Sequence, residues 1–379
     1  MKKETARQET AGKRILVGFI MDGKAGGIDT YLLHFLDEVW EEGMEIDFLT
    51  DEISPELKKK LETYHSDLFQ IASLRRPLTQ YRQVCEIIQN KPYDMAYFNV
   101  STAIDCIAAF AAKKMKVPER ILHSHSSGND CESVLQRTIY NVVHRICKPF
   151  FYKAGTRFCG CSKKAGYWLF PKRIVESPEF EVVFNAVDRE RFSYNEELRS
   201  EVRKELVAED KFVVGHLGNF CYAKNYPFLI QVFREIRKRQ QNAVLLLAGK
   251  GIELEEVKNM VHKEGLDESV RFLGWRRDTN RLYNAMDVFV LPSRFEGLPV
   301  VGVEAQSARL VSVLSSSITP EAKIQDHCYF LDLKDGPEKW AEFILGTKGT
   351  DRNCIQMLEE AKNYDLSVQN EQLKRLVWH

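Results

Sequence analysis

Apolar runs that suit buried strands alternate with stretches of helical spacing along the chain, in two successive series. The first series opens at residues 14–20 and the second at residues 212–218, with a polar joint near residues 188–205 between them. Buried apolar strands that alternate with helices predict parallel sheets covered by helices on both faces. The expected fold class is therefore α/β, with two doubly wound, Rossmann-like domains. At roughly 150 residues per domain, the length of 379 residues agrees with this expectation.

Charge balance and segment composition argue against several classes of protein. Lys plus Arg and Asp plus Glu both number 54, so no net charge favours a nucleic-acid partner. Residues 1–14 are polar and lack the apolar core of a signal peptide, and no apolar stretch reaches the ~18 residues expected of a membrane-spanning helix. The nine cysteines are scattered, and Cys159 with Cys161 makes a poor zinc signature. We therefore expect a cytoplasmic protein with reduced thiols.

Residues that follow a strand are the candidates for a site, because ligands in doubly wound domains bind beyond the carboxyl ends of the strands. Gly26 and Gly27 come after the first expected strand, where a helix is expected to begin. Their amides suit an anion or the close approach of a ligand. The dinucleotide signature G-x-G-x-x-G is absent, and a purely structural glycine turn fits the same residues.

A histidine pair and a lysine also follow expected strands. His123 and His125 are two apart on one strand and so share a face. They lack an obvious third ligand, so the sequence predicts no metal site. We expect one of the two histidines to donate to a substrate and the other to pack in the core. Lys224 stands in a loop before a helix, where a cation suits a phosphate, although a solvated surface lysine fits this position too.

Two carboxylates bracket a Gly-Leu-Pro elbow in "RFEGLPVVGVEAQ". Glu296 precedes the elbow and Glu304 follows it. Pro299 marks the start of a helix, so the amides from about Gly297 to Val301 are expected to face the crevice at the positive end of the helix dipole. A diphosphate suits these amides, and carboxylates accept hydrogen bonds from sugar hydroxyls. The elbow therefore predicts a nucleotide-sugar site.

The stretch "PSRFEGLPVVGVEAQ" resembles the Glu-x7-Glu motif of the retaining glycosyltransferases of family 4, which have the GT-B fold of two domains facing across a cleft. The resemblance covers nearly the whole chain. Other stretches that carry it are "GGIDTYLLHFL", "RILHSHSS", "FCGCSKKAGYWLF", "VVFNAVDRERF", "LLLAGKG" and "VRFLGWRRDTNRLYNAMDVFVLPS". The second and third of these are similar to the branch of the family that builds capsular polysaccharide and exopolysaccharide.

The resemblance implies a role for each residue of the elbow and its partner lysine. Glu304 would hold the ribose hydroxyls of the nucleotide, and Glu296 would contact the transferred sugar. Lys224 would neutralise the diphosphate leaving group, and the backbone near Gly297 and Leu298 would touch sugar or phosphate. From the first domain, the glycine pair at 26 and 27 would close over the phosphates, and one of the two histidines would contact a sugar hydroxyl.

One position departs from the pattern. In "GHLGNF", which holds Gly218 and Asn219, related sequences usually carry Arg in place of Asn219 and pair it with the lysine on the diphosphate. Asn donates a hydrogen bond but brings no charge. Lys224 and the helix dipole must then do more, or Arg276 or Arg294 must help, or the activity is weak.

The resemblance also implies domain boundaries and a reaction. Residues 1–188 would bind the acceptor, residues 189–360 would bind the nucleotide sugar, and residues 361–379 would form a helix that crosses back to the first domain. The reaction would move a sugar, with retention at the anomeric carbon, from a nucleotide-diphosphate sugar to a glycan or lipid-linked acceptor in cell-surface polysaccharide biosynthesis. A UDP-sugar is the expected donor. The leaving phosphate oxygen would take the acceptor proton, and neither a metal nor another cofactor is expected.

Two other functions remain open from the sequence. One is another GT-B enzyme, such as a nucleotide-sugar epimerase or hydrolase. The other is a non-catalytic sugar-nucleotide-binding subunit that supports a transferase, an idea that only Asn219 favours.

Two stretches of the first half mix basic and aromatic residues, at 147–157 and 163–173. Such mixtures suit anionic lipid headgroups, so they predict peripheral contact with the inner face of the membrane. A helix with aromatics in the core and a solvated rim of cations gives the same pattern.

Overall fold

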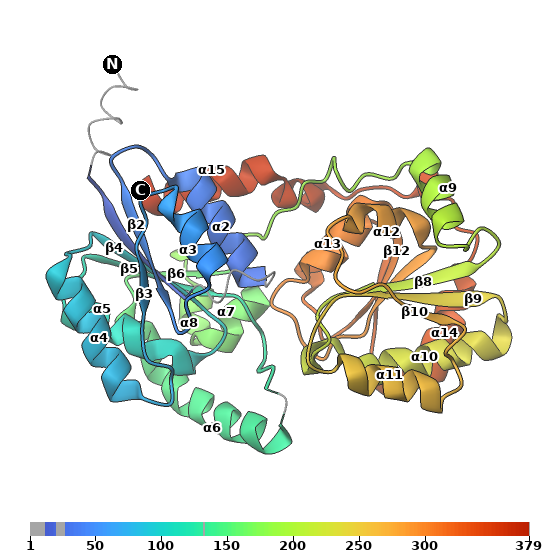
Figure 1. Cartoon of the computed structure of the whole chain (residues 1–379), viewed down its shortest axis with the longest axis horizontal. Helices are drawn as coiled ribbons and strands as arrows, with labels where there is room; N and C mark the ends of the chain where they lie inside the picture. Colours follow the sequence, from blue (N-terminus) through green and yellow to red (C-terminus); the bar gives the residue numbers. More distant parts are fainter. Residues whose placement is uncertain (1–11, 20–26, 132, 379) are drawn as a thin grey trace. The chain divides into compact units, whose positions relative to one another are not determined.

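The computed structural model describes residues 12–19, 27–131 and 133–378, which form two compact units (Figure 1). Unit 1 comprises Met1–Asn129, Val134–Asn185 and Ser367–His379, and unit 2 comprises Asp130–Ser133 and Ala186–Leu366. Each unit holds one parallel sheet with helices on both faces. The predicted α/β class with two doubly wound sheets is confirmed. The assignment of acceptor binding to residues 1–188 and of donor binding to residues 189–360 stays a prediction.

Unit 1 contains a seven-stranded sheet in the order β3-β2-β1-β4-β5-β6-β7. The order reverses between β1 and β4, which is where a doubly wound sheet binds its ligands. The strands are β1 (Arg14–Gly18), β2 (Glu45–Thr50), β3 (Leu68–Gln70), β4 (Met95–Val100), β5 (Glu119–Ser124), β6 (Arg157–Gly160) and β7 (Phe180–Val182). The helices are α2 (Gly27–Val39), α3 (Pro55–Glu62), α4 (Pro77–Asn90), α5 (Ile107–Lys114), α6 (Val134–Phe151), α7 (Lys163–Leu169), α8 (Lys172–Val175) and α15 (Leu366–Trp378).

Alternation along β1 explains why both faces of this sheet are buried. Ile15 and Val17 pack into one cluster, which includes Leu376 of α15, and Leu16 packs into the cluster on the opposite face. Successive strand residues point to opposite faces, so an unbroken apolar run buries both. Gly18 at the end of β1 lies level with Leu49 on β2, and the carboxyl ends of these strands therefore meet at one edge.

Unit 2 contains a six-stranded sheet in the order β10-β9-β8-β11-β12-β13. Its reversal lies between β8 and β11. The strands are β8 (Phe212–Leu217), β9 (Ala243–Ala248), β10 (Val270–Phe272), β11 (Val288–Leu291), β12 (Val311–Ser315) and β13 (Cys328–Leu331). The helices are α9 (Glu196–Glu205), α10 (Tyr226–Arg239), α11 (Leu254–Lys263), α12 (Thr279–Ala285), α13 (Val300–Ser307) and α14 (Gly336–Gly346). Figure 1 shows α10, α11 and α14 on one face of this sheet and α12 and α13 on the other.

Among the helices of the described ranges, none is both long enough and apolar enough to cross a bilayer.

Candidate active site

The loops after β8 and β11 bring together two residues that are 72 positions apart in the sequence. Lys224 Nζ lies 2.6 Å from Glu296 Oε1, and Ser293 Oγ donates to the same oxygen over 2.8 Å. The two charged side chains are 14% and 13% exposed. Because β8 and β11 are neighbours at the reversal of the sheet, this pair lies where doubly wound domains bind ligands.

The environment of Lys224 keeps its ammonium group charged. Burial opposes the charge, but the Glu296 carboxylate and its hydrogen bond, together with Cys221 and Asp130, raise the pKa of Lys224 above its ordinary value. A buried cation with one carboxylate partner retains the capacity to bind a second anion. The pair is therefore suited to an incoming diphosphate.

Gly218 leaves room for this lysine. A Cβ atom at Gly218 would lie 3.0 Å from Lys224 Cε, and the φ of +154° is one that residues with side chains rarely adopt. The Tyr226 hydroxyl donates to the Gly218 carbonyl over 2.9 Å and fixes the loop. Asn219, the next residue, is exposed. The prediction that Gly218 and Asn219 contact the donor stays open, and the structure assigns Gly218 a packing role beside Lys224.

Glu304 lies on α13 and is held by a tyrosine that the sequence analysis missed. Tyr283 of α12 is fully buried, and its hydroxyl donates to Glu304 Oε2 over 2.8 Å and to the Val301 carbonyl over 3.1 Å. Burial raises the pKa of Glu304 above its ordinary value, while the Tyr283 hydrogen bond and the charges of Arg191 and Lys224 oppose that rise. A buried tyrosine requires an acceptor for its hydroxyl, but the burial of Tyr283 follows from the packing of α12 and is not marked in the stretch "RLYNAMD" itself.

The elbow between the two carboxylates is buried at Gly297, Leu298 and Pro299, and α13 begins at Val300 with Pro299 as its N-cap. Pro299 therefore lies one position before the helix rather than inside its first turn. The amides of Gly302 and Val303 already donate to the Pro299 carbonyl, over 2.9 and 3.2 Å. The amides of Val300 and Val301 occupy the positions that have no partner within an α-helix.

Arg276 and Arg294 were the candidates to assist Lys224, and both have other partners in the structure. Arg276 donates to both carboxylate oxygens of Asp278, over 2.7 and 2.6 Å. The Arg294 guanidinium lies over the ring of Tyr222, 4.2 Å from its centroid, and donates to the Tyr222 carbonyl. The Arg294 amide donates to the Ala223 carbonyl over 2.7 Å, which ties the Glu296 loop to the Lys224 loop. Arg294 thus connects the two loops. Binding of phosphate by Arg276 stays a prediction.

In unit 1 the two histidines occupy different environments. His123 is fully buried, and its Nδ1 lies 2.6 Å from the hydroxyl of Tyr97. Burial lowers the pKa of His123 well below its ordinary value. His125 is half-buried, and its Nε2 lies 2.8 Å from Asn99 Oδ1. Burial lowers the pKa of His125 to about 3, so neutral His125 donates to the Asn99 amide oxygen.

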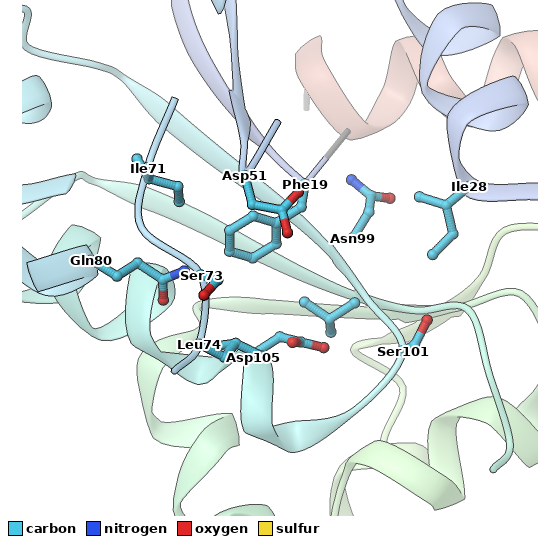
Figure 2. Close-up of a pocket in the computed structure, with 11 residues that line it drawn as sticks. Phe19, Ile28, Asp51, Ile71, Ser73, Leu74, Gln80, Asn99, Ser101 and Asp105 are labelled. Carbon is cyan, nitrogen blue, oxygen red and sulfur yellow. The ribbon is translucent and has the colours of Figure 1, made fainter. Parts of the chain in front are cut away.

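A pocket of about 250 Å³ opens at the carboxyl ends of β1 to β4 (Figure 2). Asn99, which His125 holds, is part of its wall, and so is Asp105 from the short 3-10 helix Ala103–Cys106. Burial raises the pKa of Asp105 to about 6, although the backbone and hydroxyl of Thr102 donate to it. The lining residues are Phe19, Ile28, Asp51, Ile71, Ser73, Leu74, Gln80, Asn99, Val100, Ser101 and Asp105.

Of the glycine pair after β1, one residue lies within the described ranges. Gly27 is the exposed first residue of α2, and Gly26 lies outside the described residues. Within the described ranges, His, Cys, Asp and Glu side chains do not assemble in a group of three or more that suits a metal ion.

Comparisons with known proteins agree with this architecture. Residues 211–347 match the family model described as glycosyl transferases group 1. The chain is 28% identical to a Bacillus subtilis (strain 168) protein named as the glycosyltransferase EpsF, over 92% of this chain and 91% of that protein. It is 24% identical to an Escherichia coli protein named UDP-Gal:alpha-D-GlcNAc-diphosphoundecaprenol alpha-1,3-galactosyltransferase, over 64% of this chain and 63% of that protein.

Solved structures share the fold. A crystal structure of Anabaena HepE in complex with UDP and glucose superposes with a TM-score of 0.73 at 16% identity, and covers 96% of this chain and 99% of that one. The same protein in complex with UDP-glucose gives a TM-score of 0.72.

Proposed function

We propose a reaction for this chain, which belongs to the group 1 glycosyltransferases, a retaining family (family 4) with the GT-B fold. The chain transfers a sugar from a UDP-sugar to a glycan or lipid-linked acceptor in the biosynthesis of a cell-surface polysaccharide. The observation that carries the proposal is the convergence of one buried cation, Lys224, with the carboxylates Glu296 and Glu304 at the strand ends of unit 2.

The donor site follows from the chemistry of these three side chains. Glu304, fixed by Tyr283, accepts the ribose hydroxyls. Lys224 and the amides that begin α13 face the diphosphate, because a cation and a helix N-terminus both favour negative charge. Glu296 contacts the transferred sugar, and its ion pair with Lys224 weakens when the diphosphate binds. The HepE complex with UDP-glucose supports a UDP-sugar as the donor.

The acceptor site follows from the pocket of unit 1. Its carboxylates, amides and hydroxyls suit sugar hydroxyls, and its apolar wall suits the face of a sugar ring. Asp105 accepts from the acceptor sugar, and His125 acts through Asn99, whose amide it orients. The name of the E. coli relative describes a diphosphoundecaprenol-linked acceptor, which supports a lipid-linked acceptor here.

The chemical step requires little from the protein beyond positioning and charge. The bond between the anomeric carbon and the diphosphate oxygen breaks, and the acceptor oxygen bonds to the same face of that carbon. The acceptor proton passes to the leaving phosphate oxygen, so no side chain has to act as the base. Lys224 and the start of α13 stabilise the charge that grows on the departing diphosphate.

A thermal-shift screen of UDP-sugars and GDP-sugars, followed by turnover with a lipid-linked acceptor, tests this proposal. A UDP-sugar should raise the melting temperature of the parent and should do so less in Lys224→Ala. The proposal fails if no nucleotide sugar stabilises the protein, or if a stabilising donor is never turned over with any acceptor. The second outcome would favour a non-catalytic sugar-nucleotide-binding subunit, the function that the uncharged Asn219 also fits.

A further inference from the structure

Helix α6 presents an apolar face to solvent. In a surface helix of a globular protein, the apolar stripe normally faces the core. In α6, however, only His144 and Phe151 are buried. Figure 1 shows α6 on the outer surface of unit 1. The exposed apolar residues and their exposed fractions are Val134 (71%), Leu135 (72%), Ile139 (50%), Val142 (50%), Ile146 (62%) and Phe150 (55%).

Five of these residues form one continuous stripe, which we call the α6 stripe. Leu135, Ile139, Val142, Ile146 and Phe150 follow each other at intervals of three or four positions, so they line one side of the helix. Single exposed apolar side chains are common on protein surfaces, but a contiguous apolar patch marks an interaction site.

The surroundings of the α6 stripe are strongly basic. Residues 133–175 contain nine Lys and Arg and no Asp or Glu, in a chain whose positive and negative charges balance. Arg145 is exposed beside the stripe, and Lys153 Nζ lies 5.3 Å from the centroid of the Phe150 ring at its end. The first acidic residue after this segment, Glu176, pairs with Lys172 over 3.5 Å. The partner of this surface therefore has to be both apolar and anionic.

The structure also corrects which aromatics are available to such a partner. Phe151 and Phe170 are buried in the core of unit 1, and Trp168 stacks on His144 with 3.9 Å between ring centroids. Phe150 and Tyr167 remain exposed. The aromatics of residues 147–157 and 163–173 thus belong largely to the core, and the apolar surface is formed by the aliphatic residues of α6.

We propose that the α6 stripe lies in the headgroup region of an anionic lipid bilayer. An amphipathic helix buries its apolar face at the boundary between headgroups and acyl chains, and neighbouring Lys and Arg side chains contact the lipid phosphates. A protein groove would satisfy the apolar residues, but a lipid surface satisfies both the stripe and the basic segment that surrounds it. This inference does not depend on the proposed reaction, because lipid binding requires neither donor nor acceptor.

Flotation with vesicles tests the proposal. The full chain should float with vesicles of phosphatidylglycerol and phosphatidylethanolamine, float far less with phosphatidylcholine, and be released by salt. Leu135→Gln, Ile139→Gln, Val142→Gln and Ile146→Gln combined should weaken binding by at least about tenfold, since affinity scales with the apolar area inserted. Arg145→Ser with Lys153→Ser should weaken it mainly at low salt.

A matched control replaces apolar residues that are as exposed but lie elsewhere. Leu78, Val207 and Ile252 are 74%, 71% and 62% exposed, and their change to Gln should leave flotation unchanged. Melting temperature and UDP binding should match the parent in every variant, so that loss of folding is recognised. Flotation of the stripe variant at the parental level overturns the proposal. Failure of the parent to float with anionic vesicles also overturns the proposal. If that parent forms a dimer that the stripe variant abolishes, the stripe joins two copies of the chain instead.

Discussion

Lys224 and Glu296 neutralise one another at the strand ends of unit 2, and this ion pair is central to the proposed donor site. A 2.6 Å contact between two side chains that are each about seven-eighths buried orients the cation before any donor arrives. A preoriented charge stabilises a developing anion without reorganisation during the reaction. Because Asn219 brings no charge, the proposed diphosphate site relies more heavily on Lys224.

The Glu304 assignment predicts a specific loss of nucleotide affinity. Glu304→Gln should weaken UDP binding by ~1.5–3 kcal/mol, the usual range for a hydrogen bond to a charged group. The fold should persist, because the Gln oxygen still accepts from the Tyr283 hydroxyl. Calorimetry with UDP and with 2′,3′-dideoxy-UDP is the measurement, and only UDP should bind less tightly to the variant. Equal UDP affinity in parent and variant would show that Glu304 does not hold the ribose.

The departure at Asn219 predicts coupling with Lys224. Asn219→Arg should raise donor affinity by placing a second cation near the diphosphate. Lys224→Ala should then cost less affinity in the Asn219→Arg background than in the parent, because residues that share a ligand group are not additive. The measurement is a double-mutant cycle on UDP binding. Additive effects would mean that the two positions do not share the phosphate.

The raised pKa of Asp105 predicts a pH dependence of acceptor use. Burial moves this pKa from 3.8 to about 6, so the carboxylate form declines as pH falls through about 6. The KM for the acceptor should rise in that range, because a protonated carboxyl accepts fewer hydrogen bonds. The stability of the fold depends on pH in the opposite direction. The free energy of unfolding decreases as pH rises from 3.8 to about 6, because Asp105 keeps its proton to a higher pH in the native state than in the unfolded chain.

Asp105→Asn should abolish both pH effects, and Asp51→Asn, on the same pocket wall, should preserve them. The KM of the acceptor measured from pH 5 to pH 8 checks the first effect, and thermal unfolding over the same range checks the second. A KM profile that stays the same in Asp105→Asn would remove Asp105 from the acceptor site.

At the level of the elements, the proposed donor site depends on close packing of the loops after β8 and β9. A Cβ atom at Gly249 would lie 1.9 Å from the Gly218 carbonyl oxygen, and Gly249 has a φ of +155°. Gly249→Ala should therefore lower the free energy of unfolding by more than about 1 kcal/mol and disturb the Lys224 loop. Gly265→Ala is the control, because Gly265 also has a positive φ but a Cβ atom there meets nothing within 4 Å. Thermal unfolding of both variants checks the prediction, which fails if the two lose equal stability.

Most elements were predictable because apolar periodicity is a local signal. The apolar stretch "EVVFNAV" (residues 181–187) shows the limit, because its pattern predicts a strand over its whole length. The structure has β7 at Phe180–Val182 only, since pairing with β6 ends at Val182 and the chain then leaves this sheet. Strand length thus depended on a partner that the segment itself does not specify.

The candidate site divides in the same way. Lys224, Glu296 and Glu304 were predictable because they follow strands in the sequence, and their position at a strand end is local information. Tyr283, the pocket of unit 1 and the exposed side of α6 depend on which helix packs against which sheet. A stripe of apolar residues predicts a buried face, and only the structure shows that the described residues of unit 1 leave the one on α6 exposed.

For the molecule as a whole, the proposed reaction requires unit 2 to bind a UDP-sugar and unit 1 to bind the acceptor. The two rival functions use the same donor site but differ in the fate of the sugar. A hydrolase or an epimerase acts on the nucleotide sugar without an acceptor, and a binding subunit leaves it intact.

The most direct test follows a ¹³C-labelled UDP-α-sugar by NMR, with and without a lipid-linked acceptor, in the parent and in Lys224→Ala. The proposed reaction predicts that the label moves to the acceptor in an α-linkage and that it remains on UDP when the acceptor is left out. It also predicts that Lys224→Ala slows the transfer by about 100-fold or more. Release of free sugar or formation of an epimer without acceptor, a β-linked product, or no change in the donor under any condition would each contradict it.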